Sequence, residues 1–449
     1  MKKTIYFFVT FLISTMCFAQ QIIHRDTRIE AMVKEVNADS LQSYVRELVS
    51  FGTRNTLSST TDTRKGIGAA REWVVKKFKQ FAENSNGRMT AFVDTTTLLP
   101  DGRRIDQKIS LGNAVAILKG TDTENTRVYI ISGHLDSRVS DVMNRTSDAP
   151  GANDDGSGVA AVMECARIMS QHSFPSTIIF VAFSGEEQGL LGAGFMAEKA
   201  KKENWNIDAM LNNDIMGSNN SNETNIINNT KLRVFSEAYS VSDTGRRAQQ
   251  IRSMGLENDG RSRQLARYVK ETGERYVDNI EVVLIYRPDR FLRGGDQTPF
   301  LSRGYTAVRL TEMNENYLHQ HQDLRTENGV EYGDLTRFMD FEYLRKNTAV
   351  NLATLANLCY APSAPLDVKI EVRNLTNSTT LNWKEPGNGK IKGYYVMVRE
   401  TSDALWQKKI FTSQTTITLP YSKDNYFFAV QSVNENGNES LPVLPSPGR

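Results

Sequence analysis

Histidines and acidic residues stand just after short apolar runs of the sequence, where they could hold metal ions. His134 follows the run 128–132, and a histidine at the end of a buried parallel strand lies at the sheet edge where open α/β proteins bind ligands. Asp136 stands two residues further on, and a nearby carboxylate can accept the second ring N–H of a metal-bound imidazole. Taken alone, this pair fits a structural histidine about as well as a metal ligand.

Two further motifs place adjacent acids in glycine-rich loops. Asp154 and Asp155 lie between glycines, directly before a helix-like stretch. One of them could be a helix N-cap, but a cap needs only one acid. Glu186 and Glu187 follow a second buried apolar run and are also flanked by glycines. One carboxylate of such a pair can bind a metal while the other stays free as a base.

The last motifs are Asp214, after a third short apolar run, and the pair His319 and His321. The remaining histidines, His24 and His172, stand in polar contexts typical of the surface. Two imidazoles with several carboxylates suit zinc, and less selectively cobalt or manganese. Because the pattern contains no cysteine, a closed structural zinc site is disfavoured. The motifs together predict a metal centre at the strand ends of one α/β domain.

The surrounding sequence predicts a sheet that carries helices on both faces. Apolar runs at 128–132, 177–183 and 209–212 are typical of strands buried on both sides. Helix-like stretches alternate with them, and a long helix is expected over 333–358. We therefore expect a three-layer α/β/α sandwich with a central mixed, mostly parallel sheet.

The pattern changes after the proline-containing segment 361–365, which predicts a linker. Short strand-like runs then alternate with turn-rich gaps, as in a small β-sandwich. With Trp383, Tyr395 and Tyr426 in these runs, this part resembles a fibronectin type III domain. It contains no histidine, so we expect an accessory module without catalytic residues. A spacer role is favoured over contact with a surface, a glycan or a protein partner.

The first 19 residues predict a secretory signal peptide. Lys2 and Lys3 precede an apolar run that is too short for a comfortable membrane span. An uncleaved anchor, or a lipid on Cys17, are the alternatives. We therefore expect a secreted or periplasmic protein whose mature chain has no membrane span.

Length and charge set the remaining bounds. A chain of 449 residues suggests about two domains, which we place at 20–360 and 361–449. A net charge of +2, from 54 basic and 52 acidic residues, gives no reason to expect nucleic acid as a partner. After cleavage Cys165 and Cys359 would remain, and two free thiols or one disulfide fit equally well.

As a set, the motifs resemble the co-catalytic di-zinc aminopeptidases of metallopeptidase family 28, over about residues 40 to 360. The resemblance implies two zinc ions per chain and peptide substrates. It implies the following roles: His134 and Asp214 bind one zinc, Glu187 and His319 bind the other, Asp154 bridges both, Glu186 is the general base, and Asp136 orients His134.

The resemblance also selects between the two neighbouring histidines. The family histidine stands four residues before an acid, as His319 stands before Asp323, which makes His321 a supporting or surface residue. It further implies a cis peptide bond between Asp154 and Asp155.

The sequence departs from the family at two positions. Asn153 stands where relatives often carry an acid, although that residue is not a ligand. Relatives often place a tyrosine near 290–296 to stabilise the oxyanion, whereas this stretch has none. Arg293 or Tyr286 could substitute, and the sequence does not choose between them.

The expected activity is the removal of N-terminal residues from peptides. A glutaminyl cyclase, which uses a single zinc on this fold, and a carboxypeptidase acting on acidic C-termini are the alternatives among enzymes. A binding protein on a peptidase scaffold is the alternative without catalysis.

Overall fold

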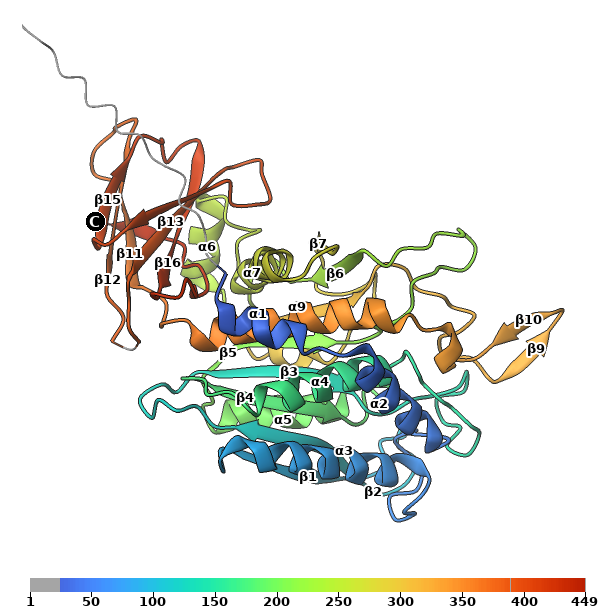
Figure 1. Cartoon of the computed structure of the whole chain (residues 1–449). Helices are drawn as coiled ribbons and strands as arrows, with labels where there is room; N and C mark the ends of the chain where they lie inside the picture. The colour runs from blue at the N-terminus through green and yellow to red at the C-terminus, as the bar shows by residue number, and fades with distance from the viewer. Residues whose placement is uncertain (1–24, 388, 449) are drawn as a thin grey trace, which may run out of the picture.

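The structure is a computed structural model that describes residues 25–387 and 389–448. The signal peptide predicted for residues 1–19 lies outside these residues. Within the described chain, no helix has the length and apolar character needed to cross a membrane. The chain forms a large α/β part followed by a smaller β-rich part (Figure 1).

Eight strands form one mixed sheet in the order β1-β2-β4-β3-β5-β8-β6-β7. The four central strands run parallel to one another, β2 runs antiparallel to β4, and the parallel pair β6 and β7 runs antiparallel to β8. The apolar runs predicted as buried strands correspond to β3, β4 and β5. The strands are β1 (Met89–Leu98), β2 (Ile109–Leu118), β3 (Val128–His134), β4 (Thr177–Phe183), β5 (Ile207–Asn213), β6 (Lys231–Phe235), β7 (Glu281–Ile285) and β8 (Ala307–Glu312).

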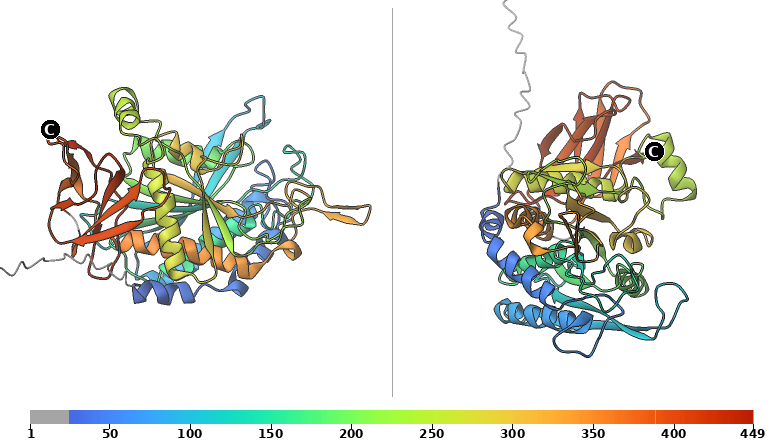
Figure 2. Two further views of the ribbon diagram at one scale, coloured as in Figure 1. Left: turned by 90° about the horizontal axis from the view of Figure 1, so that it is seen from above. Right: turned by 90° about the vertical axis from the view of Figure 1, so that its right-hand side faces the viewer.

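Helices cover both faces of this sheet and complete the three-layer sandwich (Figures 1 and 2). Successive residues of a strand point to opposite faces, so Ile131 packs into one core with most of the helices, whereas Ile130 packs into a second core with α5 and α8. The helices are α1 (Thr27–Lys34), α2 (Ala38–Ser50), α3 (Gly66–Ala82), η1 (Glu83–Ser85), α4 (Gly156–Met169), α5 (Leu191–Lys202), α6 (Gly245–Ser253), α7 (Arg261–Tyr276), α8 (Gln297–Leu301), η2 (Thr336–Phe338) and α9 (Phe341–Tyr360). The predicted fold class is confirmed.

The long helix predicted over 333–358 begins later than expected, at Phe341. Asp340 is its N-cap and accepts a hydrogen bond from the backbone N–H of Tyr343 at 2.9 Å, which satisfies one of the donors that a helix start leaves free. The preceding residues form η2 and irregular chain that approaches the site described below. Cys359 of this helix and Cys165 of α4 are both buried free thiols, so the disulfide alternative is excluded.

The C-terminal part is a β-sandwich of two sheets, ordered β15-β12-β11-β17 and β14-β13-β16. Trp383 and Tyr394 pack edge to face inside it, with ring centroids 5.2 Å apart. Its strands are β11 (Leu366–Glu371), β12 (Thr379–Lys384), β13 (Gly393–Glu400), β14 (Lys408–Thr412), β15 (Thr416–Leu419), β16 (Tyr426–Val433) and β17 (Ser446–Gly448). A separate hairpin, β9 (Arg325–Glu327) with β10 (Val330–Tyr332), projects from the other end of the molecule (Figure 1).

The sandwich packs against α7 and the end of α9 through buried polar contacts (Figure 1). Glu439 pairs with Arg275 of α7 at 2.8 Å and accepts a hydrogen bond from Asn357 of α9 at 3.0 Å. Trp406 donates to Gln264 of α7 at 3.2 Å. Charged and polar groups are costly to bury unless they are paired. Because moving the sandwich would break these pairs, they fix its position on the α/β part.

Candidate metal centre

The first group of possible metal ligands lies at the carboxyl ends of β3 and β5. His134 is the last residue of β3, and Asp214 directly follows the last residue of β5. The strands β3 and β5 are hydrogen-bonded neighbours in the sheet. The Nε2 atom of His134 lies 3.0 Å from Oδ1 of Asp154 and 3.8 Å from Oδ1 of Asp214. All three side chains are buried, and their donor atoms lie within 4.8 Å of one another.

The second group shares Asp154 with the first. The other oxygen of this carboxylate, Oδ2, lies 2.9 Å from Nε2 of His321, and that nitrogen is 2.8 Å from Oε1 of Glu187. These donor atoms also lie within 4.8 Å of one another. Asp154 thus offers one oxygen to each group, the geometry that a bridging carboxylate needs.

The structure does not bring His319 into this cluster, which corrects the choice made between the two histidines. The His319 ring stacks on Phe338, with centroids 3.6 Å apart and planes 7° apart. A tight turn starts at Asn316, and His321 has a left-handed φ of 54°, so the chain turns the two rings to different sides. The spacing before Asp323 could not reveal this, because Asp323 is exposed and stands outside the site.

Asp155 and Asp334 hold the backbone around Asp154. The carboxylate of Asp155 caps α4 and also accepts a hydrogen bond from the backbone of His134 at 2.9 Å. Asp334 accepts from the backbone N–H groups of Asn153 and Asp154 at 2.8 and 2.7 Å. The Asp154–Asp155 peptide bond is cis, as the family resemblance implies. Asp334 was missed because its role depends on a contact between distant parts of the chain.

Asp136 contacts the site differently from the prediction. Nδ1 of His134 lies 3.0 Å from the backbone oxygen of Asp136 and 3.8 Å from the nearer carboxylate oxygen, so the closest partner of the ring is the carbonyl. The carboxylate instead accepts hydrogen bonds from the backbone N–H groups of Glu186 and Glu187 at 3.2 and 3.1 Å, and from the hydroxyl of Thr56 at 2.9 Å. Asp136 therefore positions the glutamate loop through its side chain and the histidine through its backbone.

Glu186 lines the same cavity as the cluster but belongs to neither ligand group. No hydrogen bond from the described residues reaches its carboxylate. Burial raises the pKa of Glu186 well above its ordinary value, and the neighbouring carboxylates of Glu187 and Asp214 raise it further. This is the behaviour of a group that can hold and release a proton.

Arginines surround the outer side of the cluster. Arg309 of β8 is fully buried and lies 3.0 Å from Asp214. Burial would raise the pKa of Asp214, but Arg309 and the other cations around it outweigh burial and lower this pKa. Arg309 was not predicted from the sequence, although an arginine inside an apolar strand is a usable signal, because a buried charge needs a partner.

Of the two residues considered for the oxyanion, only Arg293 lines the cavity. The hydroxyl of Tyr286 lies 3.2 Å from Nε of Arg267 and donates to the backbone oxygen of Ala404 at 3.2 Å, so it faces the sandwich. Asn153 donates to Glu312 at 3.0 Å, so an amide–acid pair stabilises the loop at this position.

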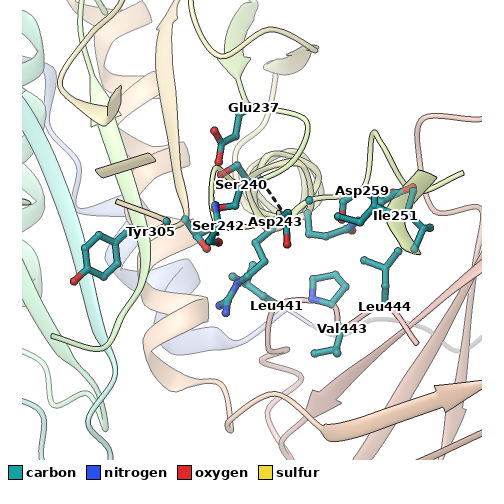
Figure 3. Close-up of a pocket in the computed structure, with 18 of the residues that line it drawn as sticks. Glu237, Ser240, Ser242, Asp243, Ile251, Asp259, Tyr305, Leu441, Val443 and Leu444 are labelled. Carbon is teal, nitrogen blue, oxygen red and sulfur yellow. Dashed lines mark hydrogen bonds between the residues drawn. The ribbon is translucent and has the colours of Figure 1, made fainter. Parts of the chain in front are cut away.

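A second cavity lies between the α/β part and the sandwich (Figure 3). It has a volume of about 320 Å³, and Glu237, Asp243 and Tyr305 line it from one side while Leu441 and Val443 line it from the other. None of the predicted site residues and no histidine is among the described residues that line it. The chemistry of the chain is therefore expected in the first cavity.

The donor set of the first cavity fits zinc. Each group combines one imidazole nitrogen with carboxylate oxygens, which are ligands that zinc accepts. Without cations, three buried carboxylates this close together would repel one another, and the two histidines and Arg309 would have to compensate their charges. His134, Asp154 and Asp214 could hold one ion, and Asp154, Glu187 and His321 a second.

Fold and site together define a class of α/β proteins that carry a cluster of metal ligands at the carboxyl edge of a mixed sheet. Residues 113–341 match the model of peptidase family M28, and residues 363–446 match that of the fibronectin type III domain. The chain belongs to peptidase family M28, and it carries a C-terminal fibronectin type III domain.

Relatives extend over nearly the whole chain. A probable zinc metalloprotease of Leptosphaeria maculans is 45% identical over 94% of this chain and 98% of its own length. A probable zinc metalloprotease of Pyrenophora tritici-repentis is 42% identical over 94% of this chain and 88% of its own length. Among solved structures, the LapA aminopeptidase of Legionella pneumophila has a TM-score of 0.51 at 20% identity and covers 75% of this chain and 76% of its own. The last similarity supports the fold alone.

Proposed function

We propose that this protein is a zinc-dependent exopeptidase that removes N-terminal residues from peptides and uses two zinc ions. The observation that carries the proposal is the carboxylate of Asp154, whose two oxygens face two separate histidine-containing groups at 3.0 and 2.9 Å. A single-metal enzyme has no need of a carboxylate shared in this way, whereas two-metal hydrolases do.

The proposal assigns His134 and Asp214 to one zinc ion, Glu187 and His321 to the other, and Asp154 to both. When bound, the ions would polarise the scissile carbonyl and lower the pKa of a water molecule from about 15.7 towards 7. His321 therefore has the role that the family resemblance implied for His319.

Glu186 is the general base of the proposed reaction. Its carboxylate takes a proton from the attacking water and then delivers that proton to the nitrogen of the leaving amine. Because burial favours the neutral form of the carboxyl group, Glu186 can hold the proton between the two steps. Asp136 keeps the loop of Glu186 in place through the backbone hydrogen bonds described above.

Arg293 is the proposed partner of the oxyanion. Its guanidinium faces the cavity, and Nη1 lies 3.6 Å from Glu315, so it is only loosely held. Tyr286 is not available for this role because its hydroxyl faces the sandwich.

The test combines a metal count with substrate assays on the full chain. We expect about two zinc ions per chain and hydrolysis of aminoacyl anilides that a chelator abolishes. The Glu186→Gln variant should keep the metal and lose roughly 10²- to 10⁴-fold in kcat. One ion per chain with cyclisation of N-terminal glutamine would favour a glutaminyl cyclase, and cleavage restricted to N-blocked peptides would favour a carboxypeptidase. Wild-type kcat in the variant would refute the base assignment.

The proposal also keeps the predicted location and domain roles. We propose that residues 1–19 are removed as a signal peptide, that the protein is secreted or periplasmic, and that residues 20–360 and 361–449 form its two domains. The sandwich is proposed as a spacer, supported by its firm packing on α7 and α9 and by the absence of histidine from its sequence. Sequencing the N-terminus of the exported protein tests the cleavage.

A further inference from the structure

The cavity in front of the metal centre has arginines in its walls. It has a volume of about 350 Å³, and Arg104, Arg138 and Arg293 reach it from three separate loops. Leu190 is the only residue with an apolar aliphatic side chain among the described residues that line it. A pocket for leucine-like side chains would be mostly apolar, so this cavity is built for a different group.

Backbone oxygens hold Arg104 and Arg138 in place. Arg104 donates to the backbone oxygen of Glu187 at 2.5 Å, and Arg138 donates to backbone oxygens of its own loop at 3.0 and 2.6 Å. The nearest carboxylate oxygens of the described residues lie 3.9 Å from Arg138 and 3.6 Å from Arg293. Backbone carbonyls orient a guanidinium but leave its positive charge uncompensated.

Arg290, the fourth arginine of the cavity, provides the contrast. It lies 3.3 Å from Asp289 and 3.2 Å from Glu315, and its side chain is 10% exposed. Its charge is already compensated by these acids, so it belongs to the framework of the site. Among the described residues, Arg104 and Arg138 have no acidic partners as close, since the nearest carboxylate oxygen to Arg138 belongs to the proposed zinc ligand Glu187, 3.9 Å away.

We propose that the substrate carries a carboxylate on the residue next to the scissile bond, and that Arg104 and Arg138 bind it. The inference rests on the proposed function, because the acids of the cavity would repel a carboxylate unless the two metal ions occupied their oxygens. When Asp154, Glu187 and Asp214 bind the metal ions, the charges left to face the substrate are mostly those of the arginines.

The chemistry of the guanidinium group supports a carboxylate over a neutral group. Its planar fork binds a carboxylate through two parallel charge-assisted hydrogen bonds. A neutral side chain in the same place would shield the guanidinium groups from water without pairing them, which is unfavourable. A hydrogen bond to a charged group typically changes binding by roughly 10- to 100-fold, and we expect discrimination of this size.

The carboxylate could come from two sources. An N-terminal aspartate or glutamate presents it on the side chain, in agreement with an aminopeptidase. A C-terminal residue presents its α-carboxylate, in agreement with a carboxypeptidase. Two substrate series distinguish them: p-nitroanilides of glutamate, glutamine and leucine, and N-blocked dipeptides with a free or an amidated C-terminus.

The experiment compares zinc-loaded wild-type protein with Arg138→Gln and Arg104→Gln. Arg103→Gln is the matched control, because Arg103 is exposed in the same loop as Arg104 and does not line the cavity. We expect wild-type kcat/KM for the glutamate anilide to exceed that for the glutamine anilide at least about tenfold. This ratio should fall towards 1 in the two cavity variants and stay unchanged in the control.

A binding measurement gives a second readout that does not depend on turnover. Titration calorimetry with zinc-loaded Glu186→Gln protein should show tighter binding of L-glutamate than of L-glutamine, and Arg104→Gln should remove the difference. If the leucine or glutamine anilide is the better substrate, the carboxylate inference is overturned while the aminopeptidase stands.

The other outcomes also separate the two proposals. Cleavage of N-blocked dipeptides that is lost on amidation would refute the aminopeptidase and support the inference, with the α-carboxylate as the source. If the arginine variants lower kcat equally for all substrates, the arginines act on the oxyanion, and the inference is wrong. No cleavage of either series, with equal binding of glutamate and glutamine, would refute both.

Discussion

Glu439 is the residue whose replacement tests most directly how the sandwich is held on the peptidase domain. Its carboxylate is 1% exposed and makes two hydrogen bonds with Arg275, at 3.0 and 2.8 Å, and a third with Asn357 at 3.0 Å. Burial would raise the pKa of Glu439, but Arg275 and then Lys409 outweigh it and lower the pKa to about 2 from an ordinary value of 4.5.

The size of the effect follows from this pKa. A difference of about 2.5 pKa units corresponds to roughly 3 kcal/mol of stability at neutral pH. Mutations that remove one partner of a buried ion pair in other proteins lower the free energy of unfolding by about 3 to 5 kcal/mol, because the other charge stays buried and unpaired. We therefore expect Glu439→Gln, which keeps the shape of the side chain, to destabilise the attachment of the sandwich by roughly 3 kcal/mol.

The assay is thermal and denaturant unfolding followed by tryptophan fluorescence, since Trp406 lies in the contact. In a domain of this size, each kcal/mol of destabilisation lowers Tm by roughly 4 to 8 °C. We therefore expect the Tm of the sandwich to fall by more than about 10 °C. Glu435→Gln is the control, because Glu435 is 75% exposed on the same domain and should change stability by less than about 0.5 kcal/mol.

The pH dependence of the same contact has a definite sign. Between about pH 4.5 and 2 the unfolded chain binds a proton at Glu439 that the folded chain does not. The stabilisation is complete above this range and is lost as the pH falls through it. Wild type and Glu439→Gln should therefore differ most near pH 7 and converge near pH 2. Equal melting temperatures of the two proteins at pH 7 would refute the reasoning.

Three further predictions concern the metal centre and the thiols. His321→Gln should lower the zinc content, measured by atomic absorption, from about two ions per chain to about one. His319→Gln should keep both ions. The reverse result would support His319 as the ligand, as the family resemblance implied. Removing zinc with a chelator should lower Tm, since an ion at 100 times its Kd contributes about 2.7 kcal/mol, and an unchanged Tm would argue against a bound metal. Because Cys165 and Cys359 are free, a reductant should leave Tm unchanged, and a shift of several degrees would indicate a disulfide.

The sequence was sufficient to predict the central strands and the residues at their ends. A strand buried on both faces must be apolar throughout, so β3, β4 and β5 stand out as short apolar runs. Polar residues directly after such runs must then lie at one edge of the sheet, and this placed His134 and Asp214 correctly in space.

Residues whose roles depend on the path of a loop could not be predicted in the same way. His319 and His321 are two residues apart, and only the left-handed backbone at His321 decides which ring reaches Asp154. Asp334 lies 180 positions from Asp154 in sequence, and its hydrogen bond to the backbone of Asp154 requires the finished fold. The long helix began later than predicted for a related reason, since periodicity alone did not identify Asp340 as its cap.

The buried charges around the cluster show why binding of cations and folding should be coupled in this protein. Asp136, Asp155 and Glu312 are all buried, and burial raises the pKa of each, which means that the fold places these acids where the charged form is disfavoured. Backbone N–H groups and Arg309 stabilise the outer acids, whereas the carboxylate oxygens of Asp154 and Glu187 contact the two histidines and, at Asp154, the amide of Gln320 at 2.9 Å. A cluster with so much negative charge needs positive charge to be stable. In this view arginines compensate the charge of the outer carboxylates, and the metal ions compensate the charge of the carboxylates at the centre of the cluster.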